Sequence, residues 1–360
     1  MITVSWMLAA ALAATGGLTP NVERVRAWEE KDRAEVLQWF ENQQFGKTPF
    51  GRLPDERIGE RCVSFPKVGI RIDITCILPV GADAQHPVPV FLFGDHFGGD
   101  RASGFRPGEY PGIPTNTITA RGYAYVRWNF NNVAPNVARL SKDLGYWPRG
   151  ILAWAATGDK DNLVDVSRPG DGWGTIGAWA WGHSRVMDWI ETRPELDATR
   201  VAVVGHSRGG KTALWAAAQD VRFAMAVSNG SGCGGARLGR ANDPKAEKIR
   251  QILFSFPHWF CPNFAAWINR DMDLPHDADD LLRLIAPRLV YVASGSEDAW
   301  AGPRAEKAAW DAAHDIYRAY GCEKNMGYHC HKGPHKLLPE DWGRFMDFAD
   351  SRLKKATAGK

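Results

Sequence analysis

Residues 205–209 read Gly-His-Ser-Arg-Gly, and the residues on either side decide how this stretch folds. Residues 201–204 are Val-Ala-Val-Val, which is typical of a buried strand, and residues 211–218 are Lys-Thr-Ala-Leu-Trp-Ala-Ala-Ala, which favour a helix. A strand, Gly-x-Ser-x-Gly and a helix in this order predict a sharp turn that exposes the hydroxyl of Ser207. A serine hydroxyl is a weak nucleophile unless it is held beside a base. We therefore predict that Ser207 is a catalytic nucleophile.

A second copy of the motif has a different surrounding sequence. Residues 182–185 repeat Gly-His-Ser-Arg, but Val186 stands in place of the closing glycine. Apolar residues before and after it recur at helical spacing. Ser184 is therefore predicted to lie inside a helix and not to act as a nucleophile.

The composition allows a large folded domain and excludes one class of partner. The chain has 360 residues, and 44% of them are hydrophobic, which is ample for a sizeable core. The net charge is +3 and no basic run stands out, so nucleic acid is not an expected partner. Most of the 16 tryptophans are explained by packing, and a few are expected to stack on sugars around a cleft.

The composition of the N-terminal segment indicates a signal peptide. Residues 1–20 are apolar and rich in alanine but too short for a confident membrane span, and residues 11–13, Ala-Leu-Ala, have the form of a signal-peptidase site. Although this segment has no Lys or Arg, we predict a signal peptide over 1–20 and a secreted or periplasmic protein. No other segment is expected to cross a membrane.

Six cysteines are compatible with an oxidising compartment. Cys62 and Cys76 flank a predicted hairpin, and Cys322 and Cys330 flank a helix-to-strand turn, so we consider disulfides at both places without assigning the pairing. His329 and His331 lie on either side of Cys330, but no nearby carboxylate or second cysteine pair completes a zinc site. We expect no metal and no cofactor.

The order of predicted elements indicates an α/β protein with one domain over residues 21–360. Strands are expected within 61–78 (an antiparallel pair) and at 88–94, 122–128, 201–204, 224–228, 289–293 and 326–330. Helices are expected at 21–50, 151–156, 177–190, 211–218, 304–320 and 340–353, with loops and short helices over 129–177 and 236–288. Such alternation predicts a mostly parallel sheet with helices on both faces, a three-layer sandwich of the α/β-hydrolase type.

The remaining catalytic groups are sought after the later strands, because in this fold the acid and then the histidine follow the serine along the chain. Asp298 lies in the turn after the 289–293 strand, with Glu297 as the alternative acid one residue away. His335 lies in the loop after the last strand, whereas His329 and His331 fall within or at the end of that strand. We predict that His335 is the base and that Asp298 orients it.

Residues 205–211, Gly-His-Ser-Arg-Gly-Gly-Lys, resemble the signature of the glucuronoyl esterases, carbohydrate esterase family 15. Four further segments are similar to bacterial members in the same order: residues 231–236, 256–264, 297–300 and 335–342. The similarity extends from the helix that contains Trp28 to the end of the chain. It implies an α/β-hydrolase that cleaves the ester between a 4-O-methyl-glucuronic acid branch of glucuronoxylan and a lignin alcohol.

The resemblance also implies roles for individual residues. Ser207 corresponds to the nucleophile, His335 to the base, and Arg208 to a side chain that helps to hold the oxyanion. A guanidinium beside the nucleophile would supply charge-assisted donors where negative charge develops.

Three more residues correspond to substrate-binding positions. Lys211 and Glu247 correspond to residues that hydrogen-bond uronate hydroxyls, and Trp300 to one that packs against the sugar. A lysine in the first turn of a helix is electrostatically unfavourable there, which slightly favours a specific role for Lys211.

The chain departs from the family pattern in two places. Many bacterial relatives have a glutamate just after the strand that follows the nucleophile, where this chain has Gly230, so the acid role falls to Asp298. Fungal relatives have a disulfide-bonded cysteine before the serine, where this chain has His206.

We therefore expect a monomeric, cofactor-free serine esterase, a carboxylic ester hydrolase acting on glucuronate esters through an acyl-enzyme. The first alternative is an α/β-hydrolase for acetyl, feruloyl or small methyl esters, against which Arg208, Lys211 and Trp300 argue. The second alternative is a catalytically silent carbohydrate-binding protein. The presence of all three predicted catalytic residues argues against it.

Overall fold

The structure is a computed structural model that describes residues 21–95, 113–136, 150–160 and 169–354. The predicted signal peptide over residues 1–20 lies outside the described residues. In the described part, no helix has both the length and the apolar character needed to cross a membrane.

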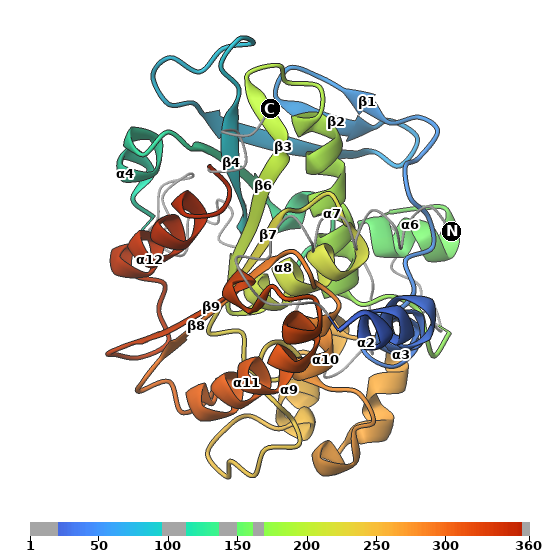
Figure 1. The fold of residues 1–360 in the computed structure, drawn as a ribbon. Coiled ribbons are helices and arrows are strands. Elements are labelled where there is room, and N and C mark those ends of the chain that lie inside the picture. The colour runs from blue at the N-terminus through green and yellow to red at the C-terminus, as the bar shows by residue number, and fades with distance from the viewer. Residues whose placement is uncertain (1–20, 96–112, 137–149, 161–168, 355–360) are drawn as a thin grey trace.

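Nine strands of the described residues form one twisted sheet in the order β1-β2-β3-β5-β4-β6-β7-β8-β9 (Figure 1). Three antiparallel strands form one side: β1 (Arg57–Ile58), β2 (Cys62–Phe65) and β3 (Ile70–Ile77). Six parallel strands form the rest: β4 (Val88–Asp95), β5 (Ala124–Asn129), β6 (Leu196–His206), β7 (Met225–Asn229), β8 (Leu289–Gly295) and β9 (Met326–His331). The predicted, mostly parallel sheet is confirmed.

Helices cover both faces of this sheet (Figure 1). On one face lie α4 (Thr115–Ala120) and α12 (Pro339–Asp350). The other face is covered by α2 (Val22–Ala27), α3 (Arg33–Gln43), α7 (Thr175–Ile190), α8 (Arg208–Gln219), α10 (Ala278–Arg283) and α11 (Pro303–Ala319). In the central strand β6, Val201 and Val203 pack toward the second group, while Ala202 and Val204 pack toward α4 and α12. This period of two gives the sheet two separate cores and produces the predicted three layers.

Most predicted elements are present within a few residues of their expected bounds. The short apolar helix is α6 (Ile151–Thr157), and Ser184 lies in α7, inside a helix as predicted. Helix α4 and the two-residue strand β1 were not predicted from the sequence. Short helical segments, including α9 (Ile249–Ser255), fill the region between β7 and β8 as expected.

The single helix predicted over residues 21–50 is wrong in extent. A π-helical turn, Trp28–Asp32, separates α2 from α3, and α3 ends at Gln43. The chain turns at Gly46, which has a φ of 87° and where a Cβ would lie 2.0 Å from the Cα of Trp173. Phe45 therefore leaves the helix and stacks on Trp215 of α8, with ring centres 4.6 Å apart.

The disulfides considered from sequence are absent. All six cysteines lie in the described residues, and all six are free. In the hairpin, Cys62 faces Asp73 on β3, whereas Cys76 pairs with Val126 on the next strand. The two thiols thus belong to different cross-strand pairs, so flanking the same turn does not bring them together.

The turn from β6 into α8 depends on a close approach between backbones. Ser207 connects the two elements with a φ of 57° and a ψ of −123°, a conformation that L residues rarely adopt. A Cβ on Gly205 would lie 1.9 Å from the carbonyl oxygen of Gly209 and 2.6 Å from the nitrogen of Gly210. The first turn of α8 therefore packs directly on the strand, which only glycine at position 205 allows.

Gly205→Ala should destabilise the protein by about 3 kcal/mol or more, because the added methyl overlaps backbone that cannot move away. Thermal unfolding of the variant against wild type measures this. Gly209→Ala is the matched control, since its Cβ would have no neighbour closer than 3.7 Å, and alanine is favoured over glycine in a helix by about 1 kcal/mol. A wild-type melting temperature for Gly205→Ala would contradict the backbone contact.

A buried carboxyl group connects α11 to the ends of two strands. Glu306 is fully buried; it accepts a hydrogen bond from the amide of Gly232 at 2.9 Å and lies 2.6 Å from the hydroxyl of Ser294. Burial raises the pKa of Glu306 to about 7, although both hydrogen bonds oppose the shift. Glu306 thus connects the glycine-rich segment after β7 to the end of β8. In the folded protein its carboxyl group is more easily protonated than in the unfolded chain.

Glu306→Gln should stabilise the protein at pH 8 by about 2–3 kcal/mol and change little at pH 4. The folded protein binds this proton more tightly than the unfolded chain, so wild-type stability falls as pH rises from about 4.5 to about 7 and stays reduced above. Glutamine resembles the neutral carboxyl and removes that loss. Urea unfolding of both proteins at the two pH values is the measurement, and the same difference at both values would contradict a raised pKa.

Candidate active site

The backbone around Ser207 holds its side chain at the carboxyl end of the sheet. The Ser207 amide donates to the carbonyl of Asn229 at the end of β7, at 2.9 Å. The Ser207 carbonyl accepts from the amide of Gly210 at 2.9 Å, which begins α8. Ser207 remains partly exposed between the buried His206 and Gly209. Its strained conformation is therefore supported on both sides, as is common where strain serves a site.

His335 and Asp298 lie together, as the sequence reasoning expected of a base and its acid. Nδ1 of His335 is 2.5 Å from Oδ2 of Asp298. The Asp298 side chain is buried, whereas that of His335 is 43% exposed. Oδ1 of Asp298 also accepts from the amide of Ala301 at 3.0 Å. Burial alone would raise the pKa of Asp298, but the hydrogen bonds from His335 and Ala301 hold it below its ordinary value, so the group is a carboxylate.

Glu297, the alternative acid, takes a different position. Its side chain is exposed, and its backbone amide donates to the carbonyl of Gly333 at 2.8 Å. Within the described residues, the carboxylate in hydrogen-bond contact with His335 is that of Asp298.

His206 connects the turn at Ser207 to His335. The two imidazole rings are tilted against each other, with centres 4.6 Å apart, so His335 lies beside the residue that precedes Ser207. Nδ1 of His206 is 2.6 Å from Oδ1 of Asn229. Burial and, to a smaller extent, the nearby His335 lower the pKa of His206 to about 4, so this ring is neutral at neutral pH. On the other side, a Cβ on Gly230 would lie 3.3 Å from the His335 ring.

Arg208 leaves the same turn and lies over an aromatic pair. The rings of Phe256 and Trp259 stack with an interplanar angle of 3° and centres 3.9 Å apart. The Arg208 guanidinium is 4.7 Å from the Trp259 ring centre and 5.5 Å from that of Phe256. Cation–π contacts of this kind fix the direction of a guanidinium. A cationic donor group is therefore held one residue after Ser207.

Lys211, Glu247 and Trp300 form a second polar group near this turn. Lys211 is buried, and its ammonium donates to the carbonyl of Ser231. Burial lowers the pKa of Lys211, and the charge of Glu247 opposes that shift. Burial also raises the pKa of Glu247, while Lys211 and a hydrogen bond from the Trp300 side chain oppose it. The Glu247 amide donates to the Trp300 carbonyl at 2.9 Å, and the Trp300 ring remains 52% exposed.

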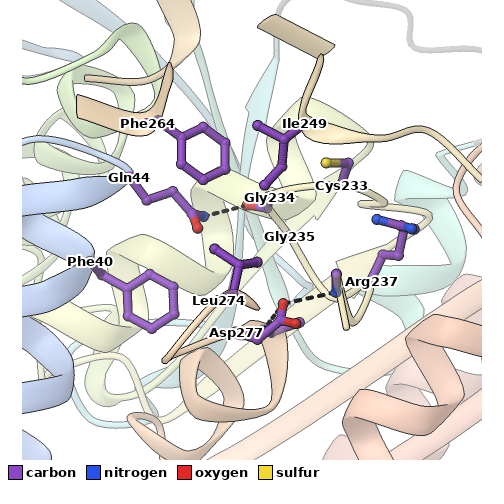
Figure 2. Close-up of a pocket in the computed structure, with 12 residues that line it drawn as sticks. Phe40, Gln44, Cys233, Gly234, Gly235, Arg237, Ile249, Phe264, Leu274 and Asp277 are labelled. Atoms are coloured by element: carbon purple, nitrogen blue, oxygen red, sulfur yellow. Dashed lines mark hydrogen bonds between the residues drawn. The ribbon is translucent and has the colours of Figure 1, made fainter. Parts of the chain in front are cut away.

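A small cavity of about 10 Å³ is lined by Cys233, Gly234 and Gly235 of the glycine-rich segment after β7 (Figure 2). This is room for about one water molecule. On one side of the cavity lies Gln44, the residue directly after α3. Its side-chain amide donates to the carbonyl of Gly234 at 3.1 Å. On another side, the Asp277 carboxylate caps α10 and accepts from the amide of Gly239 at 2.9 Å. Helices distant in sequence therefore hold this segment in place.

Several residues of this region were not predicted from the sequence. Phe256 and Trp259 lie in the segment 256–264 that resembles bacterial family members. Their contact with Arg208 has no local sequence signal beyond an aromatic-rich run. The contact between His206 and His335 was not foreseen either, because it joins residues far apart in sequence. Every residue predicted for the site is within the described part of the chain.

Comparison with known proteins gives consistent results. The family model described as glucuronyl esterase of fungi matches residues 155–321. Carbohydrate esterase MZ0003, from an unknown prokaryotic organism, is 34% identical over 92% of this chain and 87% of its own length. The 4-O-methyl-glucuronoyl methylesterase of Hypocrea jecorina is 31% identical, over 58% of this chain and 43% of that protein.

Solved structures show the same relationship. A carbohydrate esterase family 15 enzyme from a marine bacterial metagenome, described as promiscuous, aligns with a TM-score of 0.74 and 30% identity over 90% of this chain and 92% of its own. The glucuronoyl esterase from Solibacter usitatus aligns with a TM-score of 0.74 and 27% identity, over 93% and 94%. From the fold, the arrangement around Ser207 and these similarities along nearly its whole length, the chain belongs to carbohydrate esterase family 15, the glucuronoyl esterases.

Proposed function

We propose that this protein is a serine esterase that hydrolyses esters of glucuronic acid and its 4-O-methyl ether, as in lignin–glucuronoxylan cross-links. The observation that carries this proposal is the pair of Asp298 and His335, with a 2.5 Å contact, beside the strained turn at Ser207. The names of the relatives support glucuronic acid as the acid component of the ester, since several relatives are 4-O-methyl-glucuronoyl methylesterases.

The proposed chemistry begins with proton transfer from Ser207 to His335. With Nδ1–H of His335 donating to Asp298, Nε2 is the nitrogen that takes the Ser207 proton as the hydroxyl attacks the ester carbonyl. Asp298 holds the ring in this tautomer and stabilises the imidazolium that forms. His335 then protonates the leaving alcohol, and a water molecule activated by the same histidine hydrolyses the acyl-enzyme.

Arg208 is proposed to stabilise the negative charge that develops on the carbonyl oxygen. A donor group contributes most when its direction is set before the reaction, and the stacked pair of Phe256 and Trp259 supports the guanidinium in this way. Backbone amides at the start of α8 would add to the same field.

Lys211, Glu247 and Trp300 are proposed to bind the uronate. Lys211 and Glu247 are both buried and lie in each other's electrostatic field, and their mutual attraction opposes the neutralising effect of burial on each group. Together they offer a donor and an acceptor to sugar hydroxyls. The half-exposed Trp300 ring offers an apolar face to the sugar. A small acetyl ester would use none of these three groups.

A broader esterase activity is a second candidate. One observation favours it: the relative of 30% identity from the marine metagenome is described as promiscuous. Acetyl or feruloyl esters would then be cleaved by the same three catalytic groups.

We also propose that the protein is exported and acts as a monomer outside the cytoplasm. The support for export is the apolar, alanine-rich sequence of residues 1–20 and the site expected of a signal peptidase at residues 11–13.

The wild type should hydrolyse benzyl glucuronate with a much higher kcat/KM than p-nitrophenyl acetate, and Ser207→Ala should lose both activities. Steady-state kinetics on the two esters is the measurement. Lys211→Met should raise KM for the glucuronate while leaving turnover of the acetate within about twofold, because the acetate has no hydroxyls to bind. Preference for the acetate would reject the uronate ester, and activity retained by Ser207→Ala would reject the nucleophile.

Asp298→Asn should reduce kcat by about 10⁴-fold, as the corresponding change does in serine proteases, where it stabilises the wrong tautomer of the histidine. Glu297→Gln is the matched control and should keep kcat within about twofold, because this exposed side chain lies away from His335. If the control loses activity and Asp298→Asn keeps it, the acid has been assigned to the wrong residue.

A further inference from the structure

A second group of histidine and aspartate lies behind His335. Asp341, in the first turn of α12, is completely buried. Its Oδ1 is 2.6 Å from Nε2 of His329 and 2.9 Å from Nδ1 of His331, both on β9. Its Oδ2 accepts from the amide of Leu338 at 2.7 Å. Burial would raise the pKa of Asp341, but these hydrogen bonds hold it below its ordinary value, so it is a carboxylate.

The two histidines differ in what their other ring nitrogen contacts. Nδ1 of His329 is 3.1 Å from the hydroxyl of Tyr291, within the core of the sheet. Nε2 of His331 is 3.3 Å from the carbonyl oxygen of Pro334, the residue directly before His335. His331 thus connects a buried carboxylate to the backbone that carries the proposed base, whereas His329 does not.

The opposite side of the same loop is fixed by the turn that carries Asp298. The Ser296 amide donates to the His331 carbonyl at 2.9 Å, and the Glu297 amide donates to the Gly333 carbonyl at 2.8 Å. A Cβ on Gly295 would lie 2.6 Å from the Pro334 carbonyl oxygen, so the loop packs directly on β8. The Pro334 carbonyl is therefore enclosed between the end of β8 and the His331 ring.

His329, His331 and Asp341 also have the composition of a metal-binding group, with three possible ligand atoms within 4.8 Å of one another. The distances favour hydrogen bonds. Ligands of a tetrahedral Zn²⁺ lie about 2.0–2.1 Å from the metal and hence about 3.3 Å from each other. Here both imidazoles are 2.6–2.9 Å from the same oxygen, the separation of a charge-assisted N–H···O contact.

We propose that Asp341 and His331 are positioning residues for His335. Asp341 orients the His331 ring, and Nε2 of His331 forms a hydrogen bond with the Pro334 carbonyl oxygen. This hydrogen bond fixes the backbone before His335 and so sets the direction of the His335 side chain. The two contacts lie on opposite nitrogens of the same ring, at 2.9 Å from the Asp341 Oδ1 and 3.3 Å from the Pro334 carbonyl oxygen, so together they fix the ring's orientation. This inference rests on the proposed role of His335, although it does not depend on which ester is cleaved.

Two substitutions at His331 separate its two contacts. In His331→Asn the amide nitrogen takes the place of Nδ1, so the Asp341 contact remains and the Pro334 contact is lost. In His331→Gln the amide nitrogen takes the place of Nε2, so the Pro334 contact remains. We expect kcat of His331→Asn to fall by about 10²-fold with KM unchanged, the loss typical of a catalytic group displaced by about 1 Å. We expect His331→Gln to recover most of this loss.

His329→Asn is the matched control, because it removes a hydrogen bond to the same Asp341 oxygen without touching the loop. Its melting temperature should fall about as far as that of His331→Asn, while its kcat stays within about twofold of wild type. Equal losses of kcat in the two asparagine variants, or equal activity of His331→Asn and His331→Gln, would overturn the proposal.

A readout that needs no substrate completes the test. Nδ1 of His335 lies 2.5 Å from the Asp298 carboxylate, and a proton in so short a contact should be strongly deshielded. We therefore expect NMR of the ¹⁵N-histidine-labelled protein to show a downfield proton resonance that His335→Ala removes. This resonance should persist in His329→Asn and broaden in His331→Asn; should the latter not fold, Asp341→Asn replaces it with the same expectation. An unchanged resonance would overturn the proposal, as would stoichiometric Zn²⁺ binding in calorimetry that Asp341→Asn abolishes. Kinetics on p-nitrophenyl acetate keep the test independent of the uronate assignment.

Discussion

The close approach of β6 and the first turn of α8 at Gly205 is the constraint on which the rest of the site depends. It forces the chain through a positive φ at Ser207, and the hydrogen bond from Ser207 to Asn229 ties that strained residue to β7. The cost of such a conformation, of order 1–3 kcal/mol, is sustained because the surrounding sheet is buried on both faces. Strand β7 in turn leads into the segment that holds Lys211 and approaches His335.

Around this turn the molecule buries several ionisable groups close together. Lys211, Glu247 and Glu306 are each shielded from water, and each has its pKa shifted toward the neutral form. In contrast, Asp298 and Asp341 remain carboxylates because each accepts hydrogen bonds from an imidazole and from backbone amides. The proposed catalytic side is therefore polar and hydrogen-bonded, while the proposed sugar-binding side relies on charges in a low-dielectric surrounding, where electrostatic interactions are stronger.

Much of this arrangement follows from local sequence. The alternation in β6, the glycines of the turn and the helix-forming run after it specify strand, turn and helix over a few residues, so the position of Ser207 could be predicted directly. Elements with strong periodicity, such as α7, α11 and β8, appear within a few residues of their predicted bounds. The end of the N-terminal helix could not be predicted, since it is set by the approach of Trp173 to Gly46 from far along the chain.

The sequence by itself determined the fold class, a mostly parallel sheet with helices on both faces. It also determined the turn at Ser207 and the short list of acids and histidines that follow this turn. Only the tertiary structure decided that Asp298 meets His335 while Glu297 faces solvent, because adjacent residues in a turn point in different directions according to how the turn is packed. Likewise, His329 and His331 lie against Asp341 because α12 folds back over β9. The cysteines flanking the hairpin stay apart because strand register, and not distance along the chain, sets which side chains meet.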